Sequence, residues 1–159
     1  MARNYWFYER QEGDPEVRPL TMRALMNLDV VYLKDTDLVL DAMRVMREKK
    51  VRHLPIVSEQ KGRLVGLVSE TDILKNVLHG KRLTREEEYH ATLDVMLELK
   101  HIMVTKVTTL SPEAPVEDAV ELFLNRRIRS VPIVTEGGEL VGIVTETDLM
   151  KLLKHVVEN

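Results

Sequence analysis

The sequence predicts an α/β protein built from two β-α-β-β-α repeats, and two observations support this fold class. The first is a duplication: residues 51–75 (VRHLPIVSEQKGRLVGLVSETDILK) recur as residues 128–151 (IRSVPIVTEGGELVGIVTETDLMK) once Gln60 is gapped. A match of this length indicates an internal repeat, and its period exceeds that of solenoid proteins, so each copy should be a small folding unit. The second is that each copy combines short runs rich in Val, Ile and Leu with segments of helical periodicity.

Length and composition are those of an ordinary globular protein. The 159 residues suffice for one compact domain or two halves that share a core, and the hydrophobic (44%) and charged (31%) fractions are typical. No apolar stretch has the length of a membrane span or the form of a signal peptide, so we expect a cytoplasmic protein without membrane contact. The absence of cysteine excludes disulfides, and a net charge of −3 gives no bulk attraction to nucleic acid.

The repeats divide the chain into four parts. An N-terminal aromatic arm (1–20) precedes the first repeat (21–78), and a linker helix (79–98) precedes the second repeat (99–159). The arm holds four of the seven aromatic side chains, and we interpret it as a segment that docks on the body or on a second subunit rather than as a base-stacking surface. A capping box at Thr84-Arg85-Glu86-Glu87 opens the linker helix.

The elements of each repeat follow from apolar periodicity and from turn-forming residues. In the first repeat they are a short helical turn (21–27), a strand (30–33), a helix capped by Thr36 or Asp37 that runs to about Lys50, two buried strands (51–57 and 64–69) and a helix (72–78). In the second they are a strand (107–110), a helix (115–126) with Pro115 in its first turn, two strands (128–134 and 140–145) and a helix (148–157).

Each repeat ends its last strand with a hydroxyl-x-x-carboxylate motif, Ser69-Glu70-Thr71-Asp72 and Thr145-Glu146-Thr147-Asp148. The hydroxyl lies beside unpaired N–H groups at a helix start, which favours phosphate, and the carboxylate can accept two hydrogen bonds from a ribose diol. The same spacing is also a capping box, which holds a helix end and binds no ligand. Spacing alone leaves both interpretations open and favours the cap.

The pattern resembles a tandem pair of CBS domains, also called a Bateman module. The matching features are a short helix that ends in Met (Met26, Met103), a first strand with Val31 or Thr108, the strands LPIV and VPIV, and the segments GLVSETDI and GIVTETDL. The resemblance covers residues 21–154, all but the aromatic arm. It implies two repeats packed with pseudo-two-fold symmetry, adenosine-containing ligands in two clefts between them, pairing into dimers, and regulation of an attached or partner protein.

Residue by residue, the resemblance implies the following two clefts. One uses Asp148, Thr147, Thr145, Arg129 and Ser130, with purine walls at Met26, Val31, Val51 and Arg52. The other uses Asp72, Thr71, Ser69, Arg52 and His53, with walls at Met103, Thr108, Ile128 and Arg129. Arg52 and Arg129 are equivalent positions, where a guanidinium can bind phosphate with two hydrogen bonds.

These observations predict a regulatory module and not an enzyme. We expect no covalent cofactor, an adenosyl ligand (AMP, ADP, ATP or S-adenosylmethionine), and a homodimer that signals to an unknown partner protein. The apolar helix faces for the dimer are Leu74, Val77, Leu78, Leu149, Leu152 and Leu153. The alternative is a ligand-free dimerisation module whose acidic motifs are only caps. An enzyme with a metal on Glu86, His90 and Asp94 is disfavoured, because no second histidine lies nearby.

Overall fold

The computed structural model describes residues 20–77, 96–126 and 128–158. The predicted arm, except Leu20, and residues 79–95 of the predicted linker helix lie outside this part of the chain, as do Glu86, His90 and Asp94. Residues 96–98 are described and are not helical. Glu98 instead pairs with Leu38, and the Leu97 carbonyl accepts a hydrogen bond from the Val39 N–H. The linker therefore ends in extended backbone that pairs with the start of a helix of the first repeat.

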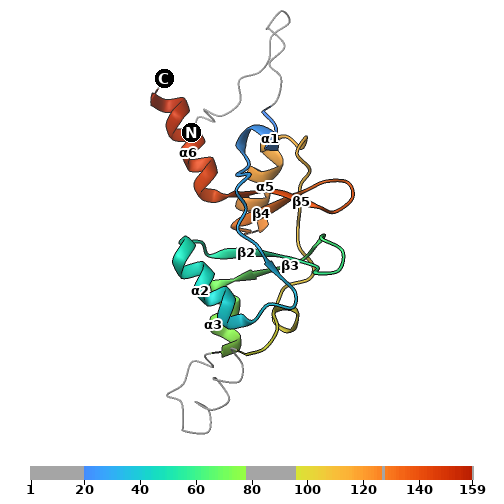
Figure 1. The fold of residues 1–159 in the computed structure, drawn as a ribbon. Coiled ribbons are helices and arrows are strands. Elements are labelled where there is room, and N and C mark those ends of the chain that lie inside the picture. The colour runs from blue at the N-terminus through green and yellow to red at the C-terminus, as the bar shows by residue number, and fades with distance from the viewer. Residues whose placement is uncertain (1–19, 78–95, 127, 159) are drawn as a thin grey trace, which may run out of the picture.

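The predicted α/β fold class with two repeats is confirmed (Figure 1). The first repeat contains α1 (Met22–Leu25), β1 (Leu33–Lys34), α2 (Val39–Lys49), β2 (His53–Val57), β3 (Leu64–Ser69) and α3 (Glu70–Val77). The second contains the short 3-10 helix η1 (Leu99–His101), α5 (Val116–Arg126), β4 (Ser130–Val134), β5 (Leu140–Thr145) and α6 (Glu146–Glu158).

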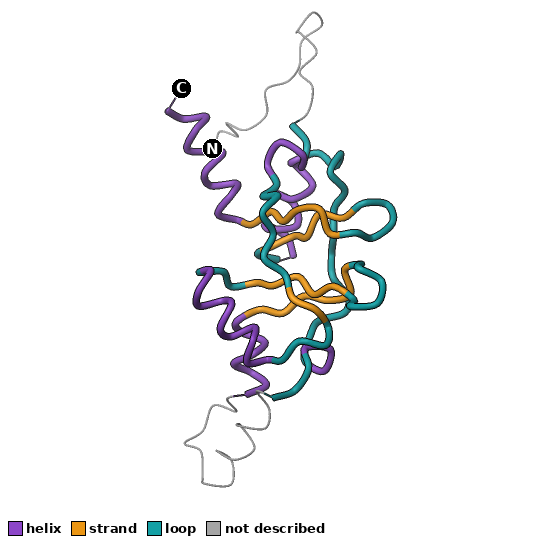
Figure 2. Tube along the Cα trace, viewed as in Figure 1, coloured by secondary structure: helices purple, strands orange, loops and turns teal. Residues whose placement is uncertain are grey.

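Each repeat is centred on an antiparallel hairpin. β2 pairs with β3 and also with β1 in parallel, whereas β4 pairs with β5 in a two-stranded sheet. The two hairpins lie one above the other at the centre of the molecule, with helices on the outer sides (Figure 2). Their turns meet, because the Leu64 N–H donates to the Gly138 carbonyl at 3.0 Å and Arg63 pairs with Glu139. The sheets therefore face each other across the boundary between the repeats.

The predicted cap of the first long helix was wrong. α2 begins at Val39 with Leu38 as its N-cap residue, and the Leu38 N–H donates to the Asp41 carboxylate at 3.2 Å. Asp37 and Thr36 have other partners: Asp37 accepts from the Lys34 N–H and closes the preceding turn, and the Thr36 hydroxyl donates to Glu59. Both candidate side chains are thus used by the loop that enters the helix.

The predicted first strand of the second repeat is reduced to one residue. Leu110 forms a single parallel bridge to Ile133, with backbone hydrogen bonds to Pro132 and Val134 on either side. Pro112 follows two residues later, and its carbonyl accepts a hydrogen bond from the Arg23 N–H of the other repeat. Pairing beyond Leu110 is prevented because the chain turns here to meet α1.

The repeats exchange their leading segments. The Met22 N–H donates to the Ala114 carbonyl of the second repeat, and Met22 is fully buried in the second core. Reciprocally, the Leu99 N–H donates to the Asp37 carbonyl of the first repeat, and Leu99 is fully buried in the first core. Neither core is therefore built from one repeat alone.

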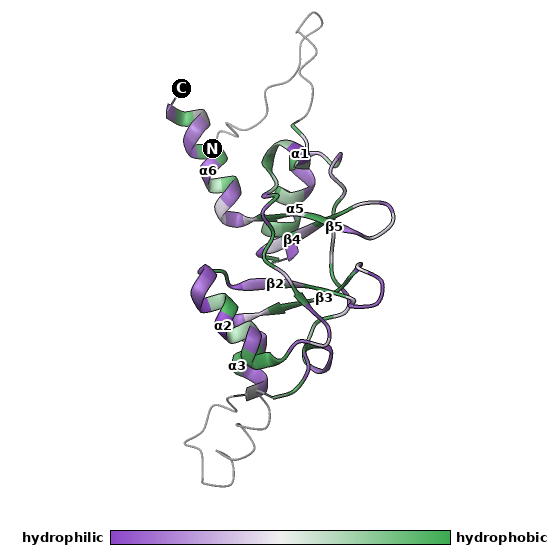
Figure 3. Ribbon diagram, in the orientation of Figure 1, coloured by the Kyte–Doolittle hydropathy of each residue, from purple (hydrophilic) through white to green (hydrophobic). Residues whose placement is uncertain are grey.

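Two apolar cores result, one on each side of the repeat boundary. The first consists of Val39, Ala42, Met46, Leu54, Ile56, Val68, Ile73 and Leu99. The second consists of Met22, Val116, Ala119, Phe123, Val131, Ile133 and Val144. Figure 3 shows apolar residues concentrated on the strands and on the inner helix faces, and polar residues at the hairpin turns. This distribution agrees with the helical and strand periodicities of the sequence.

A glycine–methionine contact secures each exchanged segment. A Cβ atom placed on Gly66 would lie 2.8 Å from Met103 Cγ, and one placed on Gly142 would lie 2.7 Å from Met26 Sδ. Distances below 3 Å are sterically forbidden, so only glycine allows each methionine to lie against the opposite strand. Met26 and Met103 are equivalent residues, and their contacts with the two hairpins are related by the same pseudo-symmetry.

We expect Gly66→Ala to destabilise the protein by about 1–3 kcal/mol, the usual effect of overpacking, and to lower the melting temperature by roughly 2–4 °C per kcal/mol. Thermal unfolding of Gly66→Ala, Met103→Ala and the double variant measures the coupling. If the contact is as described, the double variant loses less stability than the sum of the single changes. Strict additivity would contradict it.

Candidate functional site

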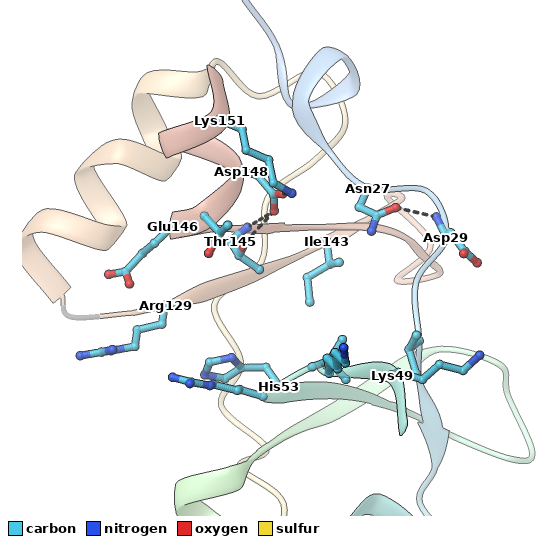
Figure 4. Close-up of a pocket in the computed structure, with 15 residues that line it drawn as sticks. Asn27, Asp29, Lys49, His53, Arg129, Ile143, Thr145, Glu146, Asp148 and Lys151 are labelled. Carbon is cyan, nitrogen blue, oxygen red and sulfur yellow. Dashed lines mark hydrogen bonds and ion pairs between the residues drawn. The ribbon is translucent and has the colours of Figure 1, made fainter. Parts of the chain in front are cut away.

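A cavity of about 730 Å³ lies between the two repeats (Figure 4). Its lining side chains come from the segment after α1, the end of α2 and start of β2, the residue before β4, the end of β5, and the first turns of α6. They are Asn27, Asp29, Val31, Lys49, Lys50, Val51, Arg52, His53, Arg129, Ile143, Thr145, Glu146, Thr147, Asp148 and Lys151. The volume is that of a typical small-molecule site.

The cavity is rich in positive charge. Five lining residues are Lys or Arg and three are Asp or Glu, although the whole chain has a net charge of −3. Val31, Val51 and Ile143 add an apolar surface beside these charges. Apolar walls with a few placed polar groups, and an excess of cations, suit a ligand with a flat ring system and an anionic group.

The hydroxyl-x-x-carboxylate motifs form helix caps in both repeats. Asp148 Oδ2 accepts from the Thr145 N–H at 2.9 Å and from the Thr145 hydroxyl at 2.6 Å. In the first repeat, Asp72 Oδ2 accepts from the Ser69 N–H at 2.9 Å and from the Ser69 hydroxyl at 2.5 Å. The two carboxylates therefore have the same orientation and the same local partners.

The surroundings of the two carboxylates differ. Asp148 lines the large cavity, and its second oxygen, Oδ1, lies 3.6 Å from Lys151 Nζ. Its side chain is 20% exposed, so it remains accessible from the cavity. Because the cap uses only Oδ2, Oδ1 keeps lone pairs for further hydrogen bonds. Asp148 also lies in the first turn of α6, where the helix dipole favours negative charge.

His53 lies where the repeats meet. It is the first residue of β2, and in Figure 4 its ring is close to Arg129, below Thr145 and Glu146. Burial lowers the pKa of His53 below its usual value of 6.5; the negative charge of Asp72 raises this pKa, and the positive charge of Arg129 lowers it. Because a lowered pKa favours the uncharged form, His53 is neutral at pH 7.

Most residues predicted for the first cleft come together in the large cavity. Those that line it are Val31, Val51, Arg52, Arg129, Thr145, Thr147 and Asp148. Two predicted members do not line it. Met26 packs over Gly142, and Ser130 is buried in β4, where its hydroxyl makes no hydrogen bond to the described residues.

The residues predicted for the second cleft are more dispersed. His53, Arg52 and Arg129 line the large cavity, whereas Thr108 lines a separate cavity of about 240 Å³ beside α5. Ser69 and Asp72 form the cap of α3, and Thr71 is exposed beside them. Met103 packs over Gly66, and Ile128 packs partly buried against the second core.

Several lining residues were not predicted from the sequence. Lys151 follows Asp148 by three residues and so lies on the same face of its helix. Lys75 has the same spacing after Asp72, and this recurrence in both repeats is a signal that could have identified Lys151. Ile143 lies two residues before Thr145 on β5 and therefore on the same strand face. Lys49 and Lys50 stand at the end of α2, where cations also complement the helix dipole, so their position alone did not indicate a cavity. Glu146 had been placed within the motif without a role, and Asn27 and Asp29 carried no signal.

A further cavity of about 490 Å³ lies between α2 and α3. Its lining is Met43, Met46, Arg47, Lys50, Val51, Arg52, Glu70, Ile73 and Leu74. Lys50, Val51 and Arg52 line both this α2–α3 groove and the large cavity, so a three-residue segment separates the two. A change in the position of this segment alters both surfaces together.

Within residues 20–77, 96–126 and 128–158, no helix is long and apolar enough to cross a bilayer. In the same ranges, no three His, Asp or Glu side chains gather in a way that could hold a metal ion.

Comparison with known proteins agrees with the two-repeat fold. The family model for the CBS domain matches residues 22–79 and 99–155. Protein MJ1426 of Methanocaldococcus jannaschii is 29% identical over 84% of this chain and 91% of its own length. Protein MJ1225 of the same organism is 30% identical over 87% of this chain, but the chain spans only 51% of that protein.

Solved structures have the same fold. CBSX2 in complex with AMP has a TM-score of 0.70 and 25% identity, over 86% of this chain and 97% of that one. The CBS domain pair of protein MJ0100, in complex with 5′-methylthioadenosine and S-adenosylmethionine, has a TM-score of 0.70 and 23% identity, over 87% of this chain and 99% of that one. With both repeats matched by the family model and the fold shared with solved CBS pairs, this chain belongs to the CBS domain family.

Proposed function

We propose that this CBS pair is a regulatory module that binds an adenosine-containing ligand in the large cavity and signals to a partner protein. The observation that carries the proposal is the cavity itself, because its walls come from both repeats and it combines an accessible carboxylate with five cations. The AMP complex of CBSX2 supports an adenosyl ligand, as does the fold shared with the MJ0100 pair. The ligand class proposed is AMP, ADP, ATP or S-adenosylmethionine.

Each part of the ligand has a suitable partner in the cavity. Asp148 Oδ1, which the cap does not use, is the acceptor for the ribose hydroxyls. Val31, Val51 and Ile143 supply an apolar surface for the purine ring. The cations of the lining bind the phosphate or carboxylate group; they are Arg52, Arg129, Lys151, Lys49 and Lys50.

The shared wall gives a route from ligand to partner. A ligand that contacts Arg52 or Lys50 also fixes one side of the α2–α3 groove, since these residues line both. Met43 and Leu74 in this groove are each more than 40% exposed. We infer that a partner at the groove senses whether the cavity is filled, because binding there depends on the same three-residue segment.

A ligand-free dimerisation module is the second candidate. It is favoured by the caps, which give both acidic motifs a purely structural role. It is also favoured by exposed apolar side chains on the outer helices, which are Leu40, Met43, Leu74, Val120, Leu124, Met150, Leu153 and Val157. Of these, Met43 of α2 and Leu74 of α3 lie together in the α2–α3 groove, and apolar side chains exposed side by side are typical of an interaction surface, so we propose a homodimer in either case.

The faces predicted for this dimer need one revision. Leu74 and Leu153 are exposed, but Leu149 and Leu152 pack partly buried against the second core and are not free for a partner. The exposed apolar face of α6 is formed by Met150, Leu153 and Val157 instead, which share one side of the helix beside the core-facing positions. Leu78 lies outside the described residues.

Asp148→Ala and Asp72→Ala form a matched pair that separates the two candidates. Both remove the same cap, so each variant should lose about 1 kcal/mol of stability. Only Asp148 lines the large cavity, so its loss should weaken AMP binding there by about 1.5–3 kcal/mol, roughly ten- to hundred-fold, while Asp72→Ala keeps affinity at that site. Calorimetric titration and thermal melting of both proteins measure these effects. Equal AMP affinities of the two variants would show that the ligand does not use Asp148, and absence of AMP binding by the wild type would favour the ligand-free module.

A ligand that bridges the repeats should also stabilise the fold. At a hundred times its dissociation constant it adds about 2.7 kcal/mol, which corresponds to a rise in melting temperature of at least about 5 °C. We expect this rise with an adenosine ligand and a smaller one with the matching guanosine compound, because exchange of the exocyclic groups leaves buried polar atoms unpaired. Hydrogen exchange should slow in residues 26–33 and in residues 145–148. Protection confined to one repeat would show that the ligand lies elsewhere.

Light scattering tests the proposed homodimer. At micromolar concentration the protein should have twice the 18.4 kDa mass of one chain. Leu153→Lys should lower the measured mass, because it places a charge on the exposed apolar face of α6 that the dimer would bury. Leu28→Lys, at an exposed position on the loop after α1, is the matched control and should leave the mass unchanged. A purely monomeric wild-type protein would exclude the dimer.

A further inference from the structure

The charged side chains that act electrostatically on His53 come from both repeats. Asp72 belongs to α3, Glu146 to α6, and Arg52 and Arg129 lie at the starts of the two repeated hairpins. Asp29, Asp148, Lys49, Lys50 and Lys151 line the same cavity. The imidazole is therefore placed between the repeats, in the cavity where the anionic part of a ligand would meet the cations.

The nearby charges act on His53 in opposite directions. Asp72 and Glu146 favour its protonated form, and Arg129 and Arg52 oppose it. Burial is the largest influence and lowers the pKa, so the neutral form dominates at pH 7 in the absence of ligand. A ligand phosphate in this cavity adds negative charge, which acts on the pKa of His53 in the same direction as Asp72 and Glu146.

We propose that His53 takes up a proton when a phosphate-bearing ligand enters the cavity, so that the site prefers phosphorylated adenosine compounds and holds them more tightly as the pH falls. The inference rests on the proposed function. The proton comes from the solvent, the imidazole changes from neutral to +1, and this charge offsets part of the charge of the phosphate. By reciprocity, a ligand that favours protonation of His53 binds the protonated protein better.

The direction and size of the effect follow from linkage. Phosphate raises the pKa of His53 from its lowered value, so affinity rises as the pH falls through the pKa of the bound state and levels off below that of the free state. One proton changes affinity by at most about tenfold per pH unit. The phosphate itself gains a proton near about pH 6, which weakens binding, so the effect of His53 must be measured against a variant without the imidazole.

The experiment compares two probes on three proteins. AMP carries a phosphate and 5′-methylthioadenosine does not; each is titrated by calorimetry between about pH 6 and pH 8, in buffers of different ionisation enthalpy, to count protons taken up. Wild type should take up a fraction of a proton with AMP and none with 5′-methylthioadenosine. His53→Gln should lose this uptake. His101→Gln is the matched control, because His101 is exposed in η1 and does not line the cavity, and it should behave as wild type.

The outcomes separate this inference from the proposed function. Binding of AMP with equal proton uptake by wild type and His53→Gln would overturn the inference and leave the ligand site intact. Failure of both probes to bind at any pH would overturn both. If His53→Gln does not fold, NMR titration of the histidine signals in wild type decides: a His53 pKa raised by AMP and not by 5′-methylthioadenosine supports the inference, and an unchanged pKa overturns it.

Discussion

The exchange of leading segments is the constraint on which the rest of this structure depends. α1 completes the second core and η1 completes the first, so the chain must cross the repeat boundary twice. On its first crossing it places Asn27 and Val31 opposite the end of β5, and Asn27 pairs with Ile143 there. The large cavity lies between this crossing segment and the start of α6. Each exchanged segment is held against the opposite hairpin by a methionine that lies over a strand glycine.

The acidic motifs show that a structural and a binding role are compatible in one side chain. The cap fixes Asp148 through two hydrogen bonds to Thr145, and both use the same carboxylate oxygen. A carboxylate held in this way needs no reorganisation before it meets a ligand, which lowers the entropic cost of binding. Asp72 has the same cap in a different setting, so the local motif alone does not decide which of the two helix starts faces the large cavity.

Features that depend on local spacing could be predicted from the sequence, and features that depend on contacts between the repeats could not. The duplication and its periodicities identified the two hairpins and the helices α2, α3, α5 and α6, since those depend on local spacing; β3 and β5 have the predicted bounds. Periodicity identifies which face of α1 is buried but not which core receives it, so the exchange was not predictable from spacing. Leu38 at the start of α2 was missed because Thr36 is engaged by Glu59 and Asp37 closes the preceding turn. Lys49 and Lys50 were not predicted to line the cavity, because its opposite wall belongs to the second repeat.

The exchange also determines when the chain can fold. Arg23 and Glu113, which join α1 to the loop before α5, are 90 residues apart in sequence. Long-range contacts of this kind form slowly, because the intervening loop must close before they contribute any stability. During synthesis the first repeat emerges before Leu99, which its core requires. At that stage α1 and Met26, which pack against the second repeat, have no partner yet. A stable first core must therefore wait for η1, and complete burial of α1 must wait for β5, so neither core can be completed by its own repeat alone.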